Sequence, residues 1–258
     1  MKSVLVSLVT VALLVYIGLC VLLFFKQRSM LYFPQPRTDV AGTTLMQLDR
    51  GDAIVNVTRL QRDAPVALIY FGGNGEDVSL SVPELAEAHP RRTLFLMHYR
   101  GYGGSTGSPS ETALVADALA LYDKVAADPN ANYSDIILVG RSLGSGIAVQ
   151  VASQRPVSRL VLVTPYDSIQ QLAARQFPYV PVRWLLLDRF ESWKYAGQVT
   201  APTLLIAAEQ DEIIPRDSTE ALLQSFRSGV AELRVIGSAS HNTISDSPDY
   251  IPLLKGGQ

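Results

Sequence analysis

The sequence predicts an α/β protein, in which a doubly wound, mostly parallel sheet of about eight strands carries a small cap and follows one N-terminal transmembrane helix. Three observations support this prediction. An uncharged apolar run lies near the N-terminus, several short segments are apolar at nearly every position, and amphipathic helical segments alternate with them. Strands that are apolar on both faces are typical of parallel sheets covered by helices on either side.

The composition of the 258 residues excludes several classes of protein. With 48% hydrophobic and 18% charged residues, the chain is globular rather than disordered. Its net charge of -2 provides no basic excess with which to bind nucleic acid. Cys20 is the only cysteine, so an intramolecular disulfide and a cysteine-based metal site are both excluded. We expect no metal and no cofactor, and the oligomeric state is left open.

The apolar run covers residues 4–25 and contains no charge. A helix of this length measures about 33 Å, enough to cross a hydrocarbon core of roughly 30 Å. The run ends without the small residues of a signal-peptide cleavage site, so we interpret residues 1–30 as a retained single-pass membrane anchor and residues 31–258 as one folded domain. More basic residues follow the run than precede it, which slightly favours a cytoplasmic domain without fixing the side of the membrane.

The strands and helices of the folded domain follow from hydrophobic periodicity. Residues 43–49 and 53–60 predict an antiparallel hairpin, and buried strands are expected at 66–71, 93–99, 135–140, 159–163, 203–208 and 232–236. The clearest helical pattern covers 109–126, for which Ser108 is the expected N-cap and Glu111 the capping-box partner. Residues 167–200 are long for a crossover and are expected to fold as a small cap.

The pattern Gly-x-Ser-x-Gly occurs twice, around Ser142 in "VGRSLGSG" and around Ser105 in "GGSTG". Ser142 follows a predicted strand directly and opens a predicted helix, the context in which a tight turn exposes a serine nucleophile. Gly140 and Gly144 would let the strand and helix backbones approach each other closely. Ser105 lies in a loop beyond a strand end, and we interpret it as a loop residue. Ser142 is therefore the predicted nucleophile.

A serine hydroxyl needs a base, and the chain has three histidines. His89 lies in a polar link and is expected to be solvated, whereas His98 lies in a strand and is expected to have a structural role. His241 follows the last strand and is the predicted base, and Asp211, after the strand at 203–208, is the predicted carboxylate that orients it. The order serine, aspartate, histidine is the one that a nucleophile elbow of this type uses. The alternative carboxylates are Glu209, Glu212 and Asp167.

Negative charge that develops on a substrate oxygen needs preorganised backbone donors. One predicted donor is the N–H of Leu143, the residue after the nucleophile. The other is assigned to Asn74 in the loop "FGGNGED", where Gly72 and Gly73 allow the amides to turn outward. A dinucleotide site in this loop is a weak alternative, because Val78 stands where the third glycine is required.

With these residues in place, the chain resembles the α/β-hydrolase superfamily and, more narrowly, its membrane-anchored, serine-aminopeptidase-like branch related to the bud-emergence hydrolases. The resemblance rests on the motifs "YRGYGGSTGSPSE", "GRSLGSG", "TPYDS", "FPYVPVRWLLLDRF", "DEIIP" and "SHN". It implies a serine hydrolase with Ser142, Asp211 and His241 as its triad, and it marks the Ser105 loop as a hallmark of the branch. Relatives commonly carry His-Gly-Asn where this chain has Gly-Gly-Asn at residues 72–74.

We therefore expect a serine hydrolase that cleaves carboxylic esters or thioesters of acyl or lipid-like substrates through an acyl-enzyme on Ser142. The large apolar side chains of residues 167–200 either line an acyl pocket or pack a crossover onto the sheet. One alternative is a serine peptidase or aminopeptidase, for which Asp188 and Glu191 are available to bind an amino group. Another is a non-catalytic, membrane-tethered binding module. The expected partners are a small acyl or lipid-like substrate and the membrane, and no nucleic acid.

Overall fold

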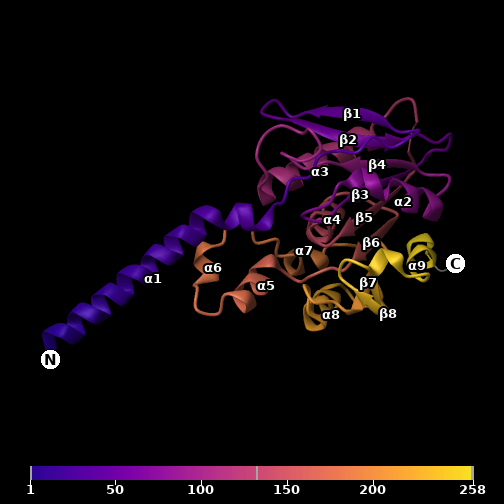
Figure 1. Cartoon of the computed structure of the whole chain (residues 1–258). Coiled ribbons are helices and arrows are strands. Elements are labelled where there is room, and N and C mark those ends of the chain that lie inside the picture. Colours follow the sequence, from indigo (N-terminus) through magenta and orange to yellow (C-terminus); the bar gives the residue numbers. More distant parts are fainter. Residues whose placement is uncertain (1, 132, 257–258) are drawn as a thin grey trace.

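The computed structural model of the chain describes residues 2–131 and 133–256. A long helix, α1 (Lys2–Leu31), projects from a body built around a single sheet, as Figure 1 shows. Over the described residues the sheet has eight strands in the order β1-β2-β4-β3-β5-β6-β7-β8. The strands are β1 (Thr44–Asp49), β2 (Ile54–Leu60), β3 (Val66–Phe71), β4 (Thr93–Met97), β5 (Asp135–Arg141), β6 (Arg159–Val163), β7 (Thr203–Gln210) and β8 (Ala231–Ser240). The prediction of a doubly wound sheet is confirmed.

The sheet is parallel except at one edge. The predicted hairpin is present, since β1 pairs with β2 in antiparallel register, and β2 pairs with β4 in the same manner. From β4 through β3 and β5 to β8, every neighbouring pair is parallel. The carboxyl ends of β3, β5, β6, β7 and β8 therefore meet at one edge, where open α/β sheets bind their ligands.

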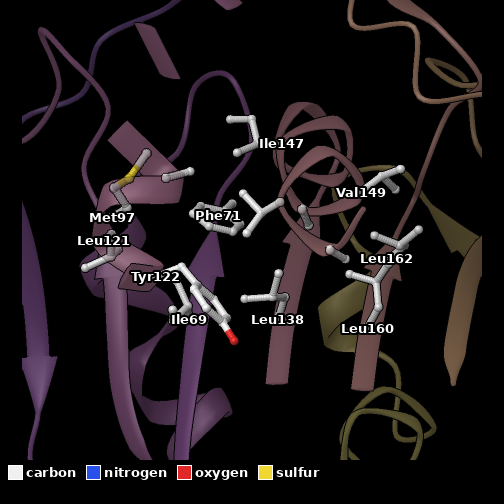
Figure 2. Close-up of a cluster of buried hydrophobic side chains, with 14 of the residues drawn as sticks. Ile69, Phe71, Met97, Leu121, Tyr122, Leu138, Ile147, Val149, Leu160 and Leu162 are labelled. Atoms are coloured by element: carbon white, nitrogen blue, oxygen red, sulfur yellow. The ribbon is translucent and has the colours of Figure 1, made fainter. Parts of the chain in front are cut away.

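Helices cover both faces of the sheet. They are α2 (Val82–Ala88), α3 (Glu111–Ala126), α4 (Leu143–Ala152), α5 (Ile169–Gln176), α6 (Val182–Leu185), α7 (Trp193–Ala196), α8 (Arg216–Ser225) and α9 (Tyr250–Lys255), with short 3₁₀ turns η1 (Val78–Ser81) and η2 (Ile244–Asp246). On one face, shown in Figure 2, Ile69 and Leu138 pack with Leu121 of α3 and Ile147 of α4. On the other face, the cluster that contains Leu68 includes side chains of α2 and α9. The alternation of strand side chains between the two faces gives each layer its own core.

The predicted start of α3 is wrong by two residues. The helix begins at Glu111, and its N-cap is Ser110 rather than Ser108. Ser110 has an extended backbone, and its hydroxyl accepts a hydrogen bond from the Ala113 N–H, as an N-cap requires. Glu111 is not a capping-box partner, because its carboxylate is turned toward the backbone of Arg189 and Phe190.

The predicted cap segment, residues 167–200, contains the short helices α5, α6 and α7. It lies beside the C-terminal part of α1, and this arrangement can be followed in Figure 1. By length and composition, α1 is apolar enough to cross a membrane. Its apolar side chains are exposed along most of its length.

Candidate active site

Ser142 occupies the turn between β5 and α4. Its backbone has φ 49° and ψ -118°, a left-handed conformation that is strained for a residue with a side chain. The turn is held by the Ser142 N–H, which donates to the Val163 carbonyl at 2.9 Å. A β-carbon at Gly144 would lie 2.0 Å from the Phe71 carbonyl oxygen, and one at Gly140 would lie 2.5 Å from that of Gly144. Small residues are therefore required on both sides of Ser142.

The structure brings Ser142, His241 and Asp211 into one chain of contacts. The His241 Nε2 atom lies 3.0 Å from the Ser142 Oγ atom, and His241 Nδ1 lies 2.9 Å from Asp211 Oδ2. Asp211 follows the end of β7 and His241 follows the end of β8, at the same edge of the sheet as Ser142. With the Nδ1–H donated to the carboxylate, Nε2 is free to accept the proton of the serine hydroxyl.

The side chains of this group are buried and positioned by further contacts. The exposed fractions of the His241 and Asp211 side chains are 6% and 7%. Asp211 Oδ1 also accepts hydrogen bonds from the N–H groups of Ile213 and Ile214, at 3.0 and 2.7 Å. These bonds fix the carboxylate in the turn after β7, so that it faces the imidazole.

The three alternative carboxylates have other partners. Glu212 accepts the His241 backbone N–H at 3.3 Å, and Glu209 accepts the Ser238 N–H at 2.9 Å. Asp167 accepts the Ser218 hydroxyl at 2.5 Å. Among the predicted carboxylates, only Asp211 contacts the ring of His241 over the described residues.

Two backbone N–H groups near Ser142 have no hydrogen-bond acceptor within the described residues. Leu143 is the first residue of α4, so its N–H lies outside the helix ladder. In the loop after β3, the Gly73 N–H donates to Glu76 Oε2 at 2.7 Å, whereas the Asn74 N–H has no such partner. The loop approaches the turn closely, since a β-carbon at Gly73 would lie 3.8 Å from that of Ser142. Asn74 and Leu143 therefore both have a backbone N–H without an acceptor near Ser142, and their role as oxyanion donors stays a prediction.

One pocket of about 540 Å³ is lined by Ser142, Leu143, His241 and Asn74. Its polar part includes Ser142, His241 and Asn74, and its apolar part includes side chains of α5 such as Ile169 and Ala173. The last two residues of α1, Met30 and Leu31, also line it. This contribution could not be predicted, because an apolar run near a terminus indicates only a membrane segment or a leader. Over the described residues, no group of three or more His, Cys, Asp or Glu side chains is arranged to hold a metal ion.

A second serine–histidine contact lies away from the pocket. His98 Nε2 is 2.8 Å from the Thr58 hydroxyl and 3.4 Å from that of Ser79. Burial lowers the pKa of His98 to about 4, so the ring is neutral at physiological pH. His98 and Ser79 are 2% and 0% exposed, which prevents a substrate from reaching them. This contact is structural, as predicted, although β4 ends at Met97 and His98 therefore lies just beyond the strand rather than within it.

The remaining predictions for serine and histidine have one correction. Ser105 is 6% exposed, and its hydroxyl donates to the His98 carbonyl at 2.9 Å and accepts the Asn56 N–H at 2.8 Å. It is therefore a buried loop residue that ties the loop to the sheet. The prediction that His89 is solvated is wrong, because His89 is 8% exposed and burial lowers its pKa to about 4. The polar residues around it in sequence gave no sign that it packs inward.

Comparison with known proteins identifies the family of the fold. Residues 66–191 match the family model described as the alpha/beta hydrolase fold. An uncharacterised protein of Mycobacterium tuberculosis is 31% identical over 227 residues, which cover 83% of this chain and 80% of that protein. Protein bem46 of Schizosaccharomyces pombe is 26% identical over 245 residues, which cover 89% and 81% of the two chains.

Solved structures share the fold at lower identity. An esterase of Pyrococcus furiosus superposes with a TM-score of 0.73 at 14% identity, covering 87% of this chain and 96% of that chain. Identity at this level supports the shared fold alone. Taken with the eight-stranded sheet and the sequence relatives, the chain belongs to the α/β-hydrolase family, in the branch that includes the bem46-like proteins.

Proposed function

We propose that this protein is a serine hydrolase that cleaves carboxylic esters or thioesters of acyl or lipid-like substrates through an acyl-enzyme on Ser142. The observation that carries the proposal is the pair of contacts made by the ring of His241. Its Nδ1 atom lies 2.9 Å from Asp211 Oδ2, and its Nε2 atom lies 3.0 Å from Ser142 Oγ. Ser142 and His241 line a pocket that also has an apolar wall, as expected of a site for an acyl group.

The chemistry follows from the roles of these groups. The Ser142 oxygen attacks the carbonyl carbon while His241 Nε2 takes the hydroxyl proton, and Asp211 stabilises the imidazolium that forms. The N–H groups of Leu143 and Asn74 are the proposed donors to the developing oxyanion, each contributing about 3 kcal/mol. The imidazolium then gives its proton to the leaving alcohol or thiol. A water molecule, deprotonated by the same imidazole, releases the acid and restores Ser142.

We also propose that α1 is retained as a single-pass membrane anchor of the folded domain. Two polar side chains near its end contact the cap segment: Gln27 accepts the Leu187 N–H at 2.7 Å, and the Arg28 guanidinium lies 2.9 Å from Asp188. The Asp188 side chain is only 6% exposed, so loss of Arg28 would leave a buried carboxylate without its basic partner. More basic residues follow the apolar run than precede it, which slightly favours a cytoplasmic domain and leaves the side of the membrane open.

The peptidase alternative receives less support. It needs free carboxylates for the substrate's amino group, and the two candidates have partners. Asp188 is paired with Arg28 and accepts the Glu111 N–H at 3.0 Å, and Glu191 is paired with Lys194 at 2.5 Å. The binding-module alternative does not account for a serine, a histidine and an aspartate in hydrogen-bond contact at a pocket.

Labelling of the full-length protein with a fluorophosphonate probe tests the nucleophile. Ser142→Ala should abolish labelling and reduce ester hydrolysis by at least about a thousandfold, because the attacking oxygen is lost. Ser105→Ala should still be labelled once folding has been checked by far-UV circular dichroism, since Ser105 is buried away from the pocket. The reverse pattern would refute the assignment. Acyl esters, acyl thioesters and aminoacyl amides are then compared as substrates, and hydrolysis of the amides alone would favour the peptidase.

A further inference from the structure

A second, apolar cavity adjoins the pocket of Ser142. Its volume is about 170 Å³, and apart from Gln27 every side chain that lines it is apolar. It shares five lining residues with the pocket of Ser142, which are Met30, Leu31, Ile169, Ala173 and Phe177. The two spaces are therefore neighbours with a common wall. The apolar lining of this cavity suits an apolar ligand better than water.

The wall of this cavity comes from two parts of the chain that are far apart in sequence. One side is the end of α1, including Leu23 and Phe24, and the other is the cap segment, including Leu185 and Leu186. Figure 1 shows α1 passing beside α6 and α5 at this place. Since α1 is a helix of the kind that crosses membranes, the cavity lies where the folded domain meets the bilayer in the proposed anchor arrangement.

Directed polar contacts fix α1 against the cap segment. The Gln27 amide donates to the Leu185 carbonyl at 3.2 Å and accepts the Leu187 N–H at 2.7 Å, so both of its polar ends are satisfied. Nearer the N-terminus of α1, the Tyr16 hydroxyl donates to the Tyr179 carbonyl at 2.8 Å. These bonds, with the Arg28 ion pair, hold the apolar side chains of α1 as a defined wall.

The outer surface of the cap segment is suited to a lipid environment. Tyr179 is 88% exposed, Trp184 is 79% exposed and Leu187 is 53% exposed. Tryptophan and tyrosine favour the interface between membrane and water. Trp184 and Leu187 flank the residues that contact the last turns of α1, so these two side chains would enter the interface together with the end of the helix. A ligand leaving the bilayer at this place meets the apolar cavity before it meets Ser142.

We infer that the end of α1 forms part of the substrate site, and that the cavity between α1 and the cap segment binds the long acyl chain of an ester taken from the bilayer. The inference rests on the proposed hydrolase function. The carbonyl carbon of the ester lies at Ser142, its acyl chain extends between Leu23 and Leu186, and the alcohol remains on the side of His241. The C–O bond to Ser142 forms as the C–O bond to the alcohol breaks, the alcohol takes the proton from His241, and water releases the fatty acid. The protein should therefore select long acyl chains.

Chain-length selectivity of the full-length protein in lipid nanodiscs tests this inference. The measurement is kcat/KM for p-nitrophenyl acetate and p-nitrophenyl laurate. In the wild type, kcat/KM should rise by up to about fourfold for each methylene that enters the cavity. Leu23→Trp fills the cavity and should lower the laurate-to-acetate ratio by about tenfold or more. Leu22→Trp, at a neighbouring position that is 55% exposed, is the matched control and should change the ratio by less than about twofold.

A second pair keeps the test decisive if Leu23→Trp fails to fold. Leu186→Phe places extra volume in the cavity from the cap segment, and Leu187→Phe is its exposed neighbour. An unchanged ratio in both cavity variants, or a wild type with no gain from acetate to laurate, would overturn the inference while acetate hydrolysis and probe labelling leave the hydrolase proposal standing. A wild type that is neither labelled nor active on acetate would instead refute the hydrolase proposal, and the inference with it.

Discussion

Glu111 joins three elements through one carboxylate, and its replacement should destabilise the fold. Its Oε2 atom accepts the N–H groups of Arg189 and Phe190, at 2.8 and 2.9 Å. Its Oε1 atom accepts the side-chain amide of Gln150 in α4, at 3.0 Å. Phe190 is fully buried and has φ 39°, a conformation that needs support from its surroundings. The carboxylate at the start of α3 therefore holds the cap segment in place.

Glu111→Ala removes the acceptor and leaves two backbone donors of the cap segment unpaired. A buried donor without a partner costs about 1–3 kcal/mol, and a hydrogen bond to a charged group contributes about 1.5–3 kcal/mol. Allowing for partial relaxation and entry of water, we expect the free energy of unfolding to fall by about 3–5 kcal/mol. Glu111→Gln keeps a carbonyl oxygen for the two N–H groups, and the Gln150 amide can rotate to accept the new N–H. This variant should lose only about 1 kcal/mol.

Urea unfolding followed by far-UV circular dichroism measures both variants against the wild type in the same detergent. The two variants separate charge from hydrogen-bond acceptance, because alanine and glutamine both remove the charge but only glutamine keeps an acceptor. A loss below about 1 kcal/mol in Glu111→Ala would show that water replaces the carboxylate at little cost. Equal losses in the two variants would show that charge, and not the geometry of acceptance, is what the cap segment requires.

Two further predictions concern pH and processing. Burial lowers the pKa of His98 to about 4, so between about pH 6.5 and pH 4 the unfolded chain binds a proton that the folded chain does not. The proton that His98 binds only in the unfolded chain should therefore lower the free energy of unfolding by about 2 kcal/mol from pH 7.5 to pH 5. His98→Gln lacks this contribution, so its loss over the same range should be smaller than that of the wild type by about 2 kcal/mol, and equal losses would contradict the prediction. The difference between the two proteins cancels the effect of His89, whose pKa burial also lowers to about 4, and that of Glu84, whose pKa burial raises to about 7 with the opposite effect on stability. Retention of α1 predicts that mass spectrometry of the membrane fraction finds the chain with residues 1–30 present, and a soluble product without them would refute the anchor.

The sheet and the position of Ser142 could be predicted because both depend on local sequence. Strands buried on both faces must be apolar along their length, and a serine between Gly140 and Gly144 at a strand end has few other structural explanations. His241 and Asp211 were predictable for a topological reason, since the loops after parallel strands share one edge of the sheet. His241 and Ser142 are 99 positions apart in the sequence, but the sheet topology brings the loops that carry them side by side.

The role of Glu111 could not be predicted, because a sequence pattern describes a residue only against its neighbours along the chain. At the start of a helix, a glutamate after serine and proline is typical of a capping box. The partners that determine its orientation, Arg189 and Phe190, are 78 and 79 positions away. The error over His89 has the same origin, because a polar flank predicts exposure only until another element covers it.

The last residue of α1 and the segment that follows it, residues 31–33, contact the loop that contains Asn74. The Asn74 side-chain amide donates to the Leu31 carbonyl at 3.1 Å, and the Asn74 carbonyl accepts the Phe33 N–H at 3.0 Å. The hydroxyl of Tyr102 donates to the same carbonyl at 2.6 Å. Asn74 is the proposed second donor to the oxyanion, so residues 31–33 help to hold that donor in a loop whose glycines at 72 and 73 would otherwise leave it flexible.

Filling the cavity and disturbing this link should therefore have different effects on the reaction. A large side chain at position 23 takes the space of an acyl chain, so it should lower kcat/KM only for substrates with a long chain. A displaced Asn74 lowers the stability of the oxyanion in every substrate, because each one passes through the same tetrahedral geometry at Ser142. Selectivity for chain length would thus depend on the last turns of α1, and the rate common to all substrates would depend on the residues that follow it.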